Sequence, residues 1–164
     1  MLAVAGKLNS KAGGPSIIVP VEKELVDLLY KPSQWAVTPD REEHNRRSVY
    51  LIAKRNLRLP FLDVFDAPDH QISCPRRESS THPPQALELL NGAFSNQMAE
   101  AFAARLQREA GADPAKQVDL AYRLAAGRAP KPKEAQLGAA FLRTQPLREF
   151  ALAVLNLNSF LYVE

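Results

Sequence analysis

The sequence of 164 residues contains one cysteine and no long apolar run. A single cysteine, Cys74, excludes an intrachain disulfide. The absence of CxxC and CxxCH motifs argues against a haem or zinc cofactor held by this chain. No apolar stretch approaches the ~20 residues of a transmembrane helix, so we expect no membrane span. The apolar start at residues 2–5 is too short for a signal peptide and has no basic region before it.

The chain also has little excess of charge of either sign. The net charge is only +3, from 21 basic and 18 acidic residues. In segment 41–77, eight basic residues stand beside five acidic residues. This mixed pattern favours a solvated surface with internal ion pairs over a nucleic-acid interface. We therefore expect no nucleic-acid partner.

Thirteen prolines punctuate the chain, and in residues 81–164 several of them precede amphipathic stripes. Helices are predicted at 84–90 and 146–157, and between them after Gly92, Asp113 and Lys131. The stripes expected to face the core are Phe94, Met98, Phe102 and Leu106; Val118, Ala121, Tyr122 and Ala125; Leu137, Phe141 and Leu142; and Leu147, Phe150, Ala151, Val154 and Leu155. The tail 159–164 is expected to dock on this core.

Residues 1–80 show fewer regular patterns. Helical turns are predicted at 21–30 and 59–66, and a short β segment at 16–19. At 48–54 a strand is favoured, with the start of a buried helix as the alternative. Trp35, in a loop, is expected to fill a core edge. The sequence thus predicts a mainly α fold: a compact bundle of short helices in 81–164, with a loop-rich half in 1–80 and minor β. We expect one domain, 1–164, and since residues 1–9 resemble a helix end, a fragment of a longer protein.

Three kinds of chemistry are conceivable in the middle of the chain. Carboxylate, imidazole and thiol groups are all metal ligands, but their spacing fits no metal template, and aspartates beside Ala67-Pro68 are also typical of turns. The group comprises Asp63, Asp66, Asp69, His70 and Cys74. We favour turn chemistry over a metal site. Cys74 itself is expected to be a small buried apolar group, with a reactive thiol near arginines as the alternative.

Paired arginines are the second feature. Guanidinium groups bind carboxylates and phosphates at two points, so a groove flanked by arginines could receive an anionic ligand. Internal pairing with the nearby aspartates and Glu78 is the favoured interpretation. The residues assigned to such a ligand site are Arg46, Arg47, Arg55, Asp66, Asp69, His70, Arg76 and Arg77.

Nucleophilic catalysis is the third. Ser79, Ser80 and Thr81 precede His82, yet a catalytic triad is defined by geometry and no GxSxG motif is present. Serines and threonines before prolines are typical of a helix start. No catalytic residue is assigned, and we expect that the protein is not an enzyme.

Four motifs in order resemble a known family. They are RRSVYLIAKRNLRLPFLDVFDAPDHQISCPRR, STHPPQALELLN, AYRLAAGRAPKPKEAQ and LNLNSFLYVE. The sequence resembles, from about residue 6 to 164, the planctomycete-specific C-terminal domain of unknown function, the PSD family. It departs at Lys131, where relatives tend to have a helix-capping residue, which predicts a weaker cap.

The resemblance implies a context more than a reaction. It implies an extracytoplasmic location in a larger exported protein whose other modules carry cytochrome c haem, and a link to complex polysaccharides. The expected function is an accessory or interaction domain whose partners are the upstream modules. The alternative is a hydrolase or binding module that acts on an anionic glycan through segment 46–77.

Overall fold

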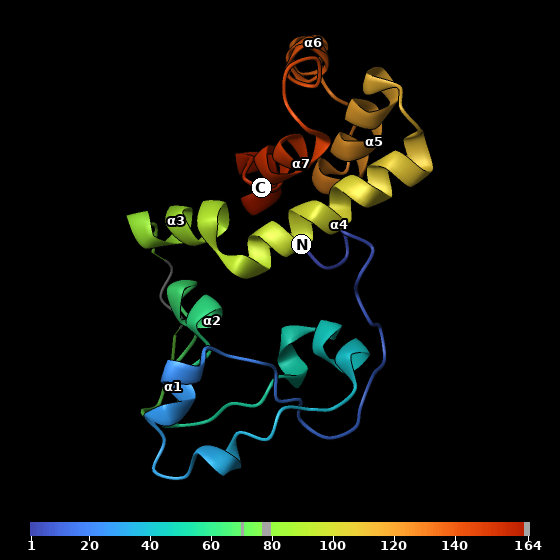
Figure 1. Cartoon of the computed structure of the whole chain (residues 1–164). Helices are drawn as coiled ribbons and strands as arrows, with labels where there is room; N and C mark the ends of the chain where they lie inside the picture. Colours follow the sequence, from blue (N-terminus) through green and yellow to red (C-terminus); the bar gives the residue numbers. More distant parts are fainter. Residues whose placement is uncertain (70, 77–79, 163–164) are drawn as a thin grey trace. The chain divides into compact units, whose positions relative to one another are not determined.

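The computed structural model describes residues 1–69, 71–76 and 80–162. Its regular elements are helical, which confirms the mainly α prediction (Figure 1). The chain divides into two compact units, and each is described by itself. Unit 1 consists of Met1–Lys7 and Ala86–Glu164, and unit 2 of Leu8–Gln85. Within the described residues, no helix is both long and apolar enough to cross a membrane.

The longer helices lie toward the C-terminal end of the chain, and their positions agree with the prediction. They are α3 (Pro83–Asn91), α4 (Ala93–Ala110), α5 (Pro114–Ala126), α6 (Pro132–Phe141), α7 (Leu147–Leu155) and α8 (Asn158–Leu161). The caps follow the sequence. The Asp113 side chain accepts a hydrogen bond from the Ala115 N–H at 2.9 Å, and Gly127 ends α5 with φ 67°.

The core of unit 1 forms where α4, α5 and α7 meet (Figure 1). Side chains four residues apart lie on one face of a helix, so each predicted stripe buries its apolar surface against the others. The buried members are Met98, Phe102, Leu106, Val118, Ala121, Tyr122, Phe150, Ala151, Val154 and Leu155. Phe160 of α8 packs on the same cluster, as expected for the C-terminal tail. Residues 2–6 form a hydrogen-bonded turn in place of the predicted helix end, and Ala5 is buried in this core.

Helix α6 presents a different face from the one predicted. Leu137 is 61% exposed, so the expectation that it faces the core is wrong. Phe141 is 36% exposed and lies at the border of the core, with its ring centroid 6.3 Å from that of Phe150, and Leu142 packs on the core as predicted. Gly138 is buried instead, and a Cβ atom there would lie 2.8 Å from Cγ2 of Val118 in α5. The glycine therefore permits a closer approach of α6 to α5 than any larger residue would allow.

Unit 2 is built from short helical elements. They are α1 (Lys23–Asp27), η1 (Pro32–Gln34), η2 (Arg41–Asn45), η3 (Ser48–Tyr50) and α2 (Pro60–Val64). A small core of Leu29, Trp35 and Leu57 holds them together. The indole N–H of Trp35 donates to the Val19 carbonyl at 3.1 Å. The prediction that Trp35 fills a core is confirmed.

The strand favoured at 48–54 is wrong, and the alternative of a helical start is nearer to the structure. The first half of this segment is the 3-10 turn η3, and its second half makes only the isolated bridges Ile17–Leu51 and Lys54–Leu57. The Leu51 N–H donates to the Ser48 carbonyl at 3.0 Å, which closes a turn where a strand would need an extended backbone. In the described residues, the minor β content is limited to such bridges.

Candidate functional site

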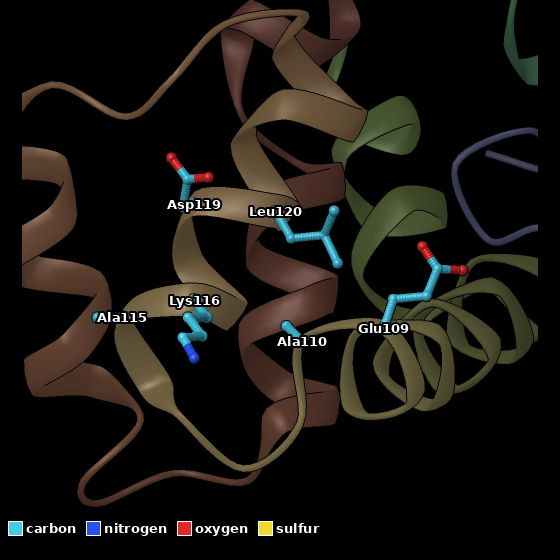
Figure 2. Close-up of a pocket in the computed structure, with 6 residues that line it drawn as sticks. All are labelled: Glu109, Ala110, Ala115, Lys116, Asp119 and Leu120. Atoms are coloured by element: carbon cyan, nitrogen blue, oxygen red, sulfur yellow. The ribbon is translucent and has the colours of Figure 1, made fainter.

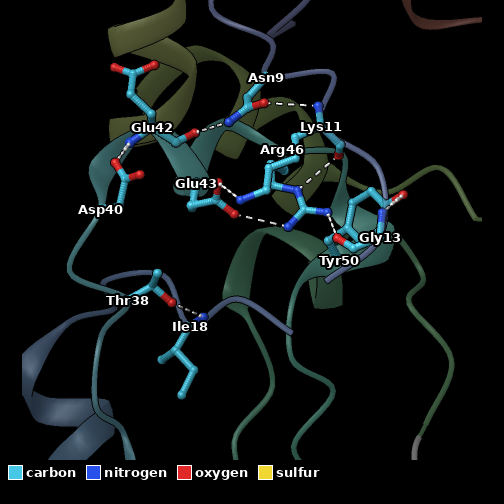
Figure 3. Close-up of polar contacts among 10 residues, drawn as sticks. All are labelled: Asn9, Lys11, Gly13, Ile18, Thr38, Asp40, Glu42, Glu43, Arg46 and Tyr50. Carbon is cyan, nitrogen blue, oxygen red and sulfur yellow. Dashed lines mark hydrogen bonds and ion pairs between the residues drawn. The ribbon is translucent and has the colours of Figure 1, made fainter. Parts of the chain in front are cut away.

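Arg46, the first residue of the predicted arginine site, is buried in unit 2 with 1% exposure (Figure 3). Its Nε donates to the Lys11 carbonyl at 3.1 Å and its Nη1 to Glu43 Oε2 at 3.0 Å. Its Nη2 donates to the Gly13 carbonyl. The guanidinium group is therefore engaged on three sides by the protein itself. Its acidic partner is Glu43, and not one of the aspartates or Glu78, with which internal pairing was expected.

An aromatic ring covers the Arg46 guanidinium. Cζ of Arg46 lies 3.9 Å from the centroid of the Tyr50 ring, and the Tyr50 hydroxyl accepts from the Gly13 N–H at 3.2 Å. The Gly13 hydrogen bond is the main cause that lowers the pKa of Tyr50, and Arg47 adds to it. Gly13 has φ +75°, a conformation that favours glycine. Tyr50 and Gly13 therefore close the cage around Arg46.

The glycine-rich loop is tied to η2 by further polar contacts (Figure 3). Lys11 Nζ lies 2.8 Å from Glu43 Oε1, and this hydrogen bond is the largest cause of the lowered pKa of Glu43. The Asn9 amide donates to the Glu42 carbonyl at 3.0 Å, and the Asp40 side chain accepts from the Glu42 N–H at 3.0 Å. These contacts fix the two carbonyl groups that hold Arg46.

A second arginine, absent from the predicted site, bridges two aspartates. Arg58 Nη1 lies 2.8 Å from Asp63 Oδ1, and its Nη2 lies 2.7 Å from Asp69 Oδ2. Hydrogen bonds to Asp63 and then Asp69 raise the pKa of Arg58. Asp69 also accepts from the Gln71 N–H at 2.8 Å, as an aspartate in a turn does.

Asp66 joins two segments of unit 2. It adopts φ 58°, a left-handed conformation that aspartate tolerates better than most residues. Its carboxylate accepts from the Ser80 N–H at 2.8 Å and from the Ser80 hydroxyl at 2.7 Å. The hydroxyl of Ser80 thus donates to Asp66 and not to a histidine, which is not the arrangement of a nucleophile activated by a base.

Three predicted arginines lie on the surface. Arg47, Arg55 and Arg76 are exposed, and none of them forms an ion pair with a residue that the structure describes. Arg47 lies 5.7 Å from the Tyr50 ring. His70 and Arg77 lie outside the described residues, as do Glu78 and Ser79.

Cys74 is exposed, so the expectation of a buried apolar cysteine is wrong. Its Sγ donates to the Arg76 carbonyl at 3.3 Å, which places the thiol in a turn at the surface. Among the described residues, no three His, Cys, Asp or Glu side chains lie together in a way that could hold a metal ion.

The described parts of the chain contain concavities in both units. One, of about 390 Å³, lies in unit 2 and has mostly apolar walls, with Lys54, Arg58 and Asp63 among its polar residues. None of the six predicted site residues that the structure describes lines it. Another, of about 530 Å³, is an open hollow at the junction of α4 and α5, shown in Figure 2. Its acids are paired, Glu109 with Arg105 at 3.0 Å and Asp119 with Arg123 at 2.7 Å.

The arrangement brings together residues that sequence reasoning did not select. Lys11, Gly13, Glu43 and Tyr50 surround Arg46, and Arg58 gathers Asp63 and Asp69. The spacing of Glu43, Arg46 and Tyr50 at i, i+3 and i+7 is the one local signal for this cage. The loop carbonyls come from residues more than 30 positions away and leave no trace in the local pattern.

Comparison with known proteins supplies a family and no activity. Residues 1–142 match the family PSD1, described as "Protein of unknown function (DUF1553)". The match covers three of the four motifs from which the resemblance was inferred and ends before the last, LNLNSFLYVE. No curated protein and no solved structure matches the chain. Since the match spans most of its length, the chain belongs to the PSD1 family of proteins of unknown function.

Proposed function

We propose that the chain is a non-catalytic accessory domain of a larger exported planctomycete protein, in which it contacts neighbouring modules. The observation that carries this proposal is the use of the polar middle segment as internal support. Arg46 is buried against two loop carbonyls and Glu43, and Asp66 is bound to Ser80. Groups held in this way stabilise loops, and the buried guanidinium of Arg46 is not available to a substrate.

The setting of the domain is part of the proposal. Haem would lie on other modules of the parent protein, and the location would be extracytoplasmic, as the family resemblance implies. The two units of the chain would act as one domain within that protein. The surface of unit 2 that remains for a partner includes the exposed side chains of Arg47, Arg55 and Arg76.

A second candidate function rests on the same three guanidinium groups. Arginines that lack an ion pair with any described residue can bind carboxylates or sulfates of an anionic polysaccharide at two points. In this alternative the chain binds such a glycan, or belongs to a hydrolase that degrades it, through segment 46–77.

A titration separates these functions. The isotope-labelled chain is titrated with the haem-bearing module of its parent protein and, separately, with polygalacturonate, while amide NMR shifts are recorded. The accessory function predicts shifts in unit 2 with the module, weakened by Arg55→Glu and unchanged by Lys116→Glu, an exposed charge reversal in unit 1. Shifts with the glycan alone favour the second function. A folded chain that binds neither refutes both.

A further inference from the structure

The outward face of α6 carries apolar residues where a solvated helix face would be polar. Leu137 and Phe141, one turn apart, are 61% and 36% exposed, and exposed Ala140 lies between them. Lys133 lies one turn before Leu137 on the same face. This set, Lys133, Leu137, Ala140 and Phe141, is called the α6 face below.

The α6 face has a structural origin. The helix packs on α5 through Gly138, whose missing side chain allows close contact with Val118 and with Phe150 of α7. Because the small residue faces inward, Leu137 points away from the core, and Phe141 lies at its border, partly exposed and with its ring centroid 6.3 Å from that of Phe150. Burial of Leu137 within this unit would require α6 to rotate about its axis, which would bring the leucine side chain against α5.

The surroundings of the α6 face are strongly basic. Segment 128–148 contains five basic residues and one acidic residue. Arg128 pairs with Glu134, and Arg148 pairs with Glu149. The other three, Lys131, Lys133 and Arg143, are exposed and form no ion pair with a described residue. An apolar stripe bordered by unpaired cations matches a partner that has apolar and acidic groups in register.

We infer that the α6 face docks an acidic amphipathic helix of a partner protein. Leucine-type side chains of that helix would cover Leu137 and Phe141, and its carboxylates would approach Lys131, Lys133 and Arg143. This mode of recognition uses the i, i+3, i+4 spacing that one helix presents to another. The surface lies in unit 1 and is separate from segment 46–77, so its test and the test of the proposed function fail independently.

A second exposed apolar surface in the same chain, with mainly acidic neighbours, serves as a control. Leu28 and Tyr30 are 81% and 92% exposed, but the neighbouring acids Glu22, Glu24 and Asp27 outnumber the two lysines, Lys23 and Lys31. Apolar exposure is thus similar or greater there, while the charge is opposite. An acidic helix should not bind this surface, whereas a peptide that binds exposed apolar side chains without regard to charge should bind it.

The probe is a synthetic amphipathic peptide of about 16 residues, long enough for four helical turns, with leucines on one face and glutamates beside them. Binding to the full chain is measured by fluorescence anisotropy, and the contact is located by amide NMR shifts on α6. Leu137→Ser should weaken binding about tenfold, since one large apolar side chain leaves the contact. Lys133→Glu should also weaken it and, as an acid in the first turn of a helix, should not impair folding. Leu28→Ser should leave it unchanged.

Several outcomes would overturn the inference. Binding that is unaffected by Leu137→Ser would show that the peptide does not dock on the α6 face. Equal binding of a peptide with lysines in place of glutamates would show that the charge of this face does not select an acidic partner. Self-association of the chain that Leu137→Ser abolishes, with no competition from the acidic peptide, would identify a second copy as the occupant. Displacement of the peptide by phosphatidylserine vesicles, with stronger binding to them, would identify a membrane surface instead.

Discussion

Cζ of Arg46 lies 3.9 Å from the centroid of the Tyr50 ring, and the same guanidinium group donates to Glu43 and to two loop carbonyls. Every face and edge of this charged group therefore meets the protein. Removal of this buried cation leaves the Lys11 and Gly13 carbonyl groups without a donor and leaves Glu43 with Lys11 as its remaining cationic partner. An unsatisfied buried acceptor costs more than the hydrogen bond itself contributes.

Arg46→Ala should therefore destabilise unit 2, by about 1–3 kcal/mol for each buried carbonyl group left without a donor. Arg46→Lys should lose a substantial part of that stability, because an ammonium group cannot reproduce the planar fork that spans Glu43 and the loop. The chain has one tryptophan, Trp35, in the core of unit 2, so urea denaturation followed by its fluorescence reports on this unit.

Arg55→Ala is the matched control for that measurement, since Arg55 is exposed and forms no ion pair with a described residue. The free energy of unfolding of the Arg55→Ala variant should remain within about 0.5 kcal/mol of the wild-type value. Equal effects of the Arg46 and Arg55 changes would contradict the structural role assigned to Arg46.

Gly138→Ala tests the close packing of α6 on α5. Alanine is the better helix former by up to ~1 kcal/mol. Its Cβ atom, however, would lie 2.8 Å and 3.0 Å from the two methyl groups of Val118, a residue with little rotamer freedom. We expect a net loss of about 1–3 kcal/mol, the usual cost of overpacking, measured by urea denaturation with far-ultraviolet circular dichroism.

A second substitution isolates this contact. In the double variant with Val118→Ala, the space lost to the new methyl group is restored, so the two costs should be less than additive. A stabilising effect of Gly138→Ala on its own would show that α6 lies farther from α5 than the structure places it.

Local chemistry explains why the helices of unit 1 could be predicted. Asp113-Pro114 and Gly127 mark the ends of α5 through caps that involve neighbouring residues only. The stripe of α4 repeats every four residues and needs no knowledge of its partner. The orientation of α6 could not be predicted in this way, because Gly138 faces inward on account of Val118 in another helix.

The candidate site in unit 2 was predictable only in outline. Asp63 and Asp69 are held by Arg58, an arginine outside the set for which such pairing was expected. The cage around Arg46 depends on the Lys11 and Gly13 carbonyls, which any residue type could supply. Backbone acceptors carry no mark in a sequence, so burial of Arg46 could not be inferred from its neighbours.

The stability contributed by Glu134 should depend on pH. Glu134 accepts two hydrogen bonds from Arg128, at 2.7 and 2.8 Å, and one from the Lys131 N–H at 2.6 Å. Chiefly through Arg128, these contacts lower the pKa of Glu134 from 4.5 to about 2. The backbone bond replaces the cap that the Lys131 side chain does not make.

Because the folded-state pKa is depressed, this stabilisation is fully present above the unfolded pKa and is lost as the pH falls toward about 2. Glu134→Gln should cost about 1–2 kcal/mol at neutral pH, a value reduced for the partial exposure of the pair. The difference from the wild type should shrink steadily in denaturation curves recorded between about pH 5 and pH 2. Glu100→Gln, an exposed change on α4, should show no such trend; a difference that is constant with pH would contradict the assignment.

Asp66 offers the clearest choice between a structural and a catalytic role for the middle segment. Its carboxylate holds both the N–H and the hydroxyl of Ser80, at 2.8 and 2.7 Å. Asp66→Ala should therefore destabilise unit 2 by about 1–3 kcal/mol, because two hydrogen bonds are lost and alanine disfavours the left-handed conformation at φ 58°. Asp66→Asn, which tolerates that conformation and keeps one acceptor oxygen, should lose less, and Ser80→Ala less again. If Asp66 were a catalytic carboxylate, Asp66→Asn would instead abolish turnover of an anionic glycan. The unfolding transition followed by Trp35 fluorescence would then stay in place.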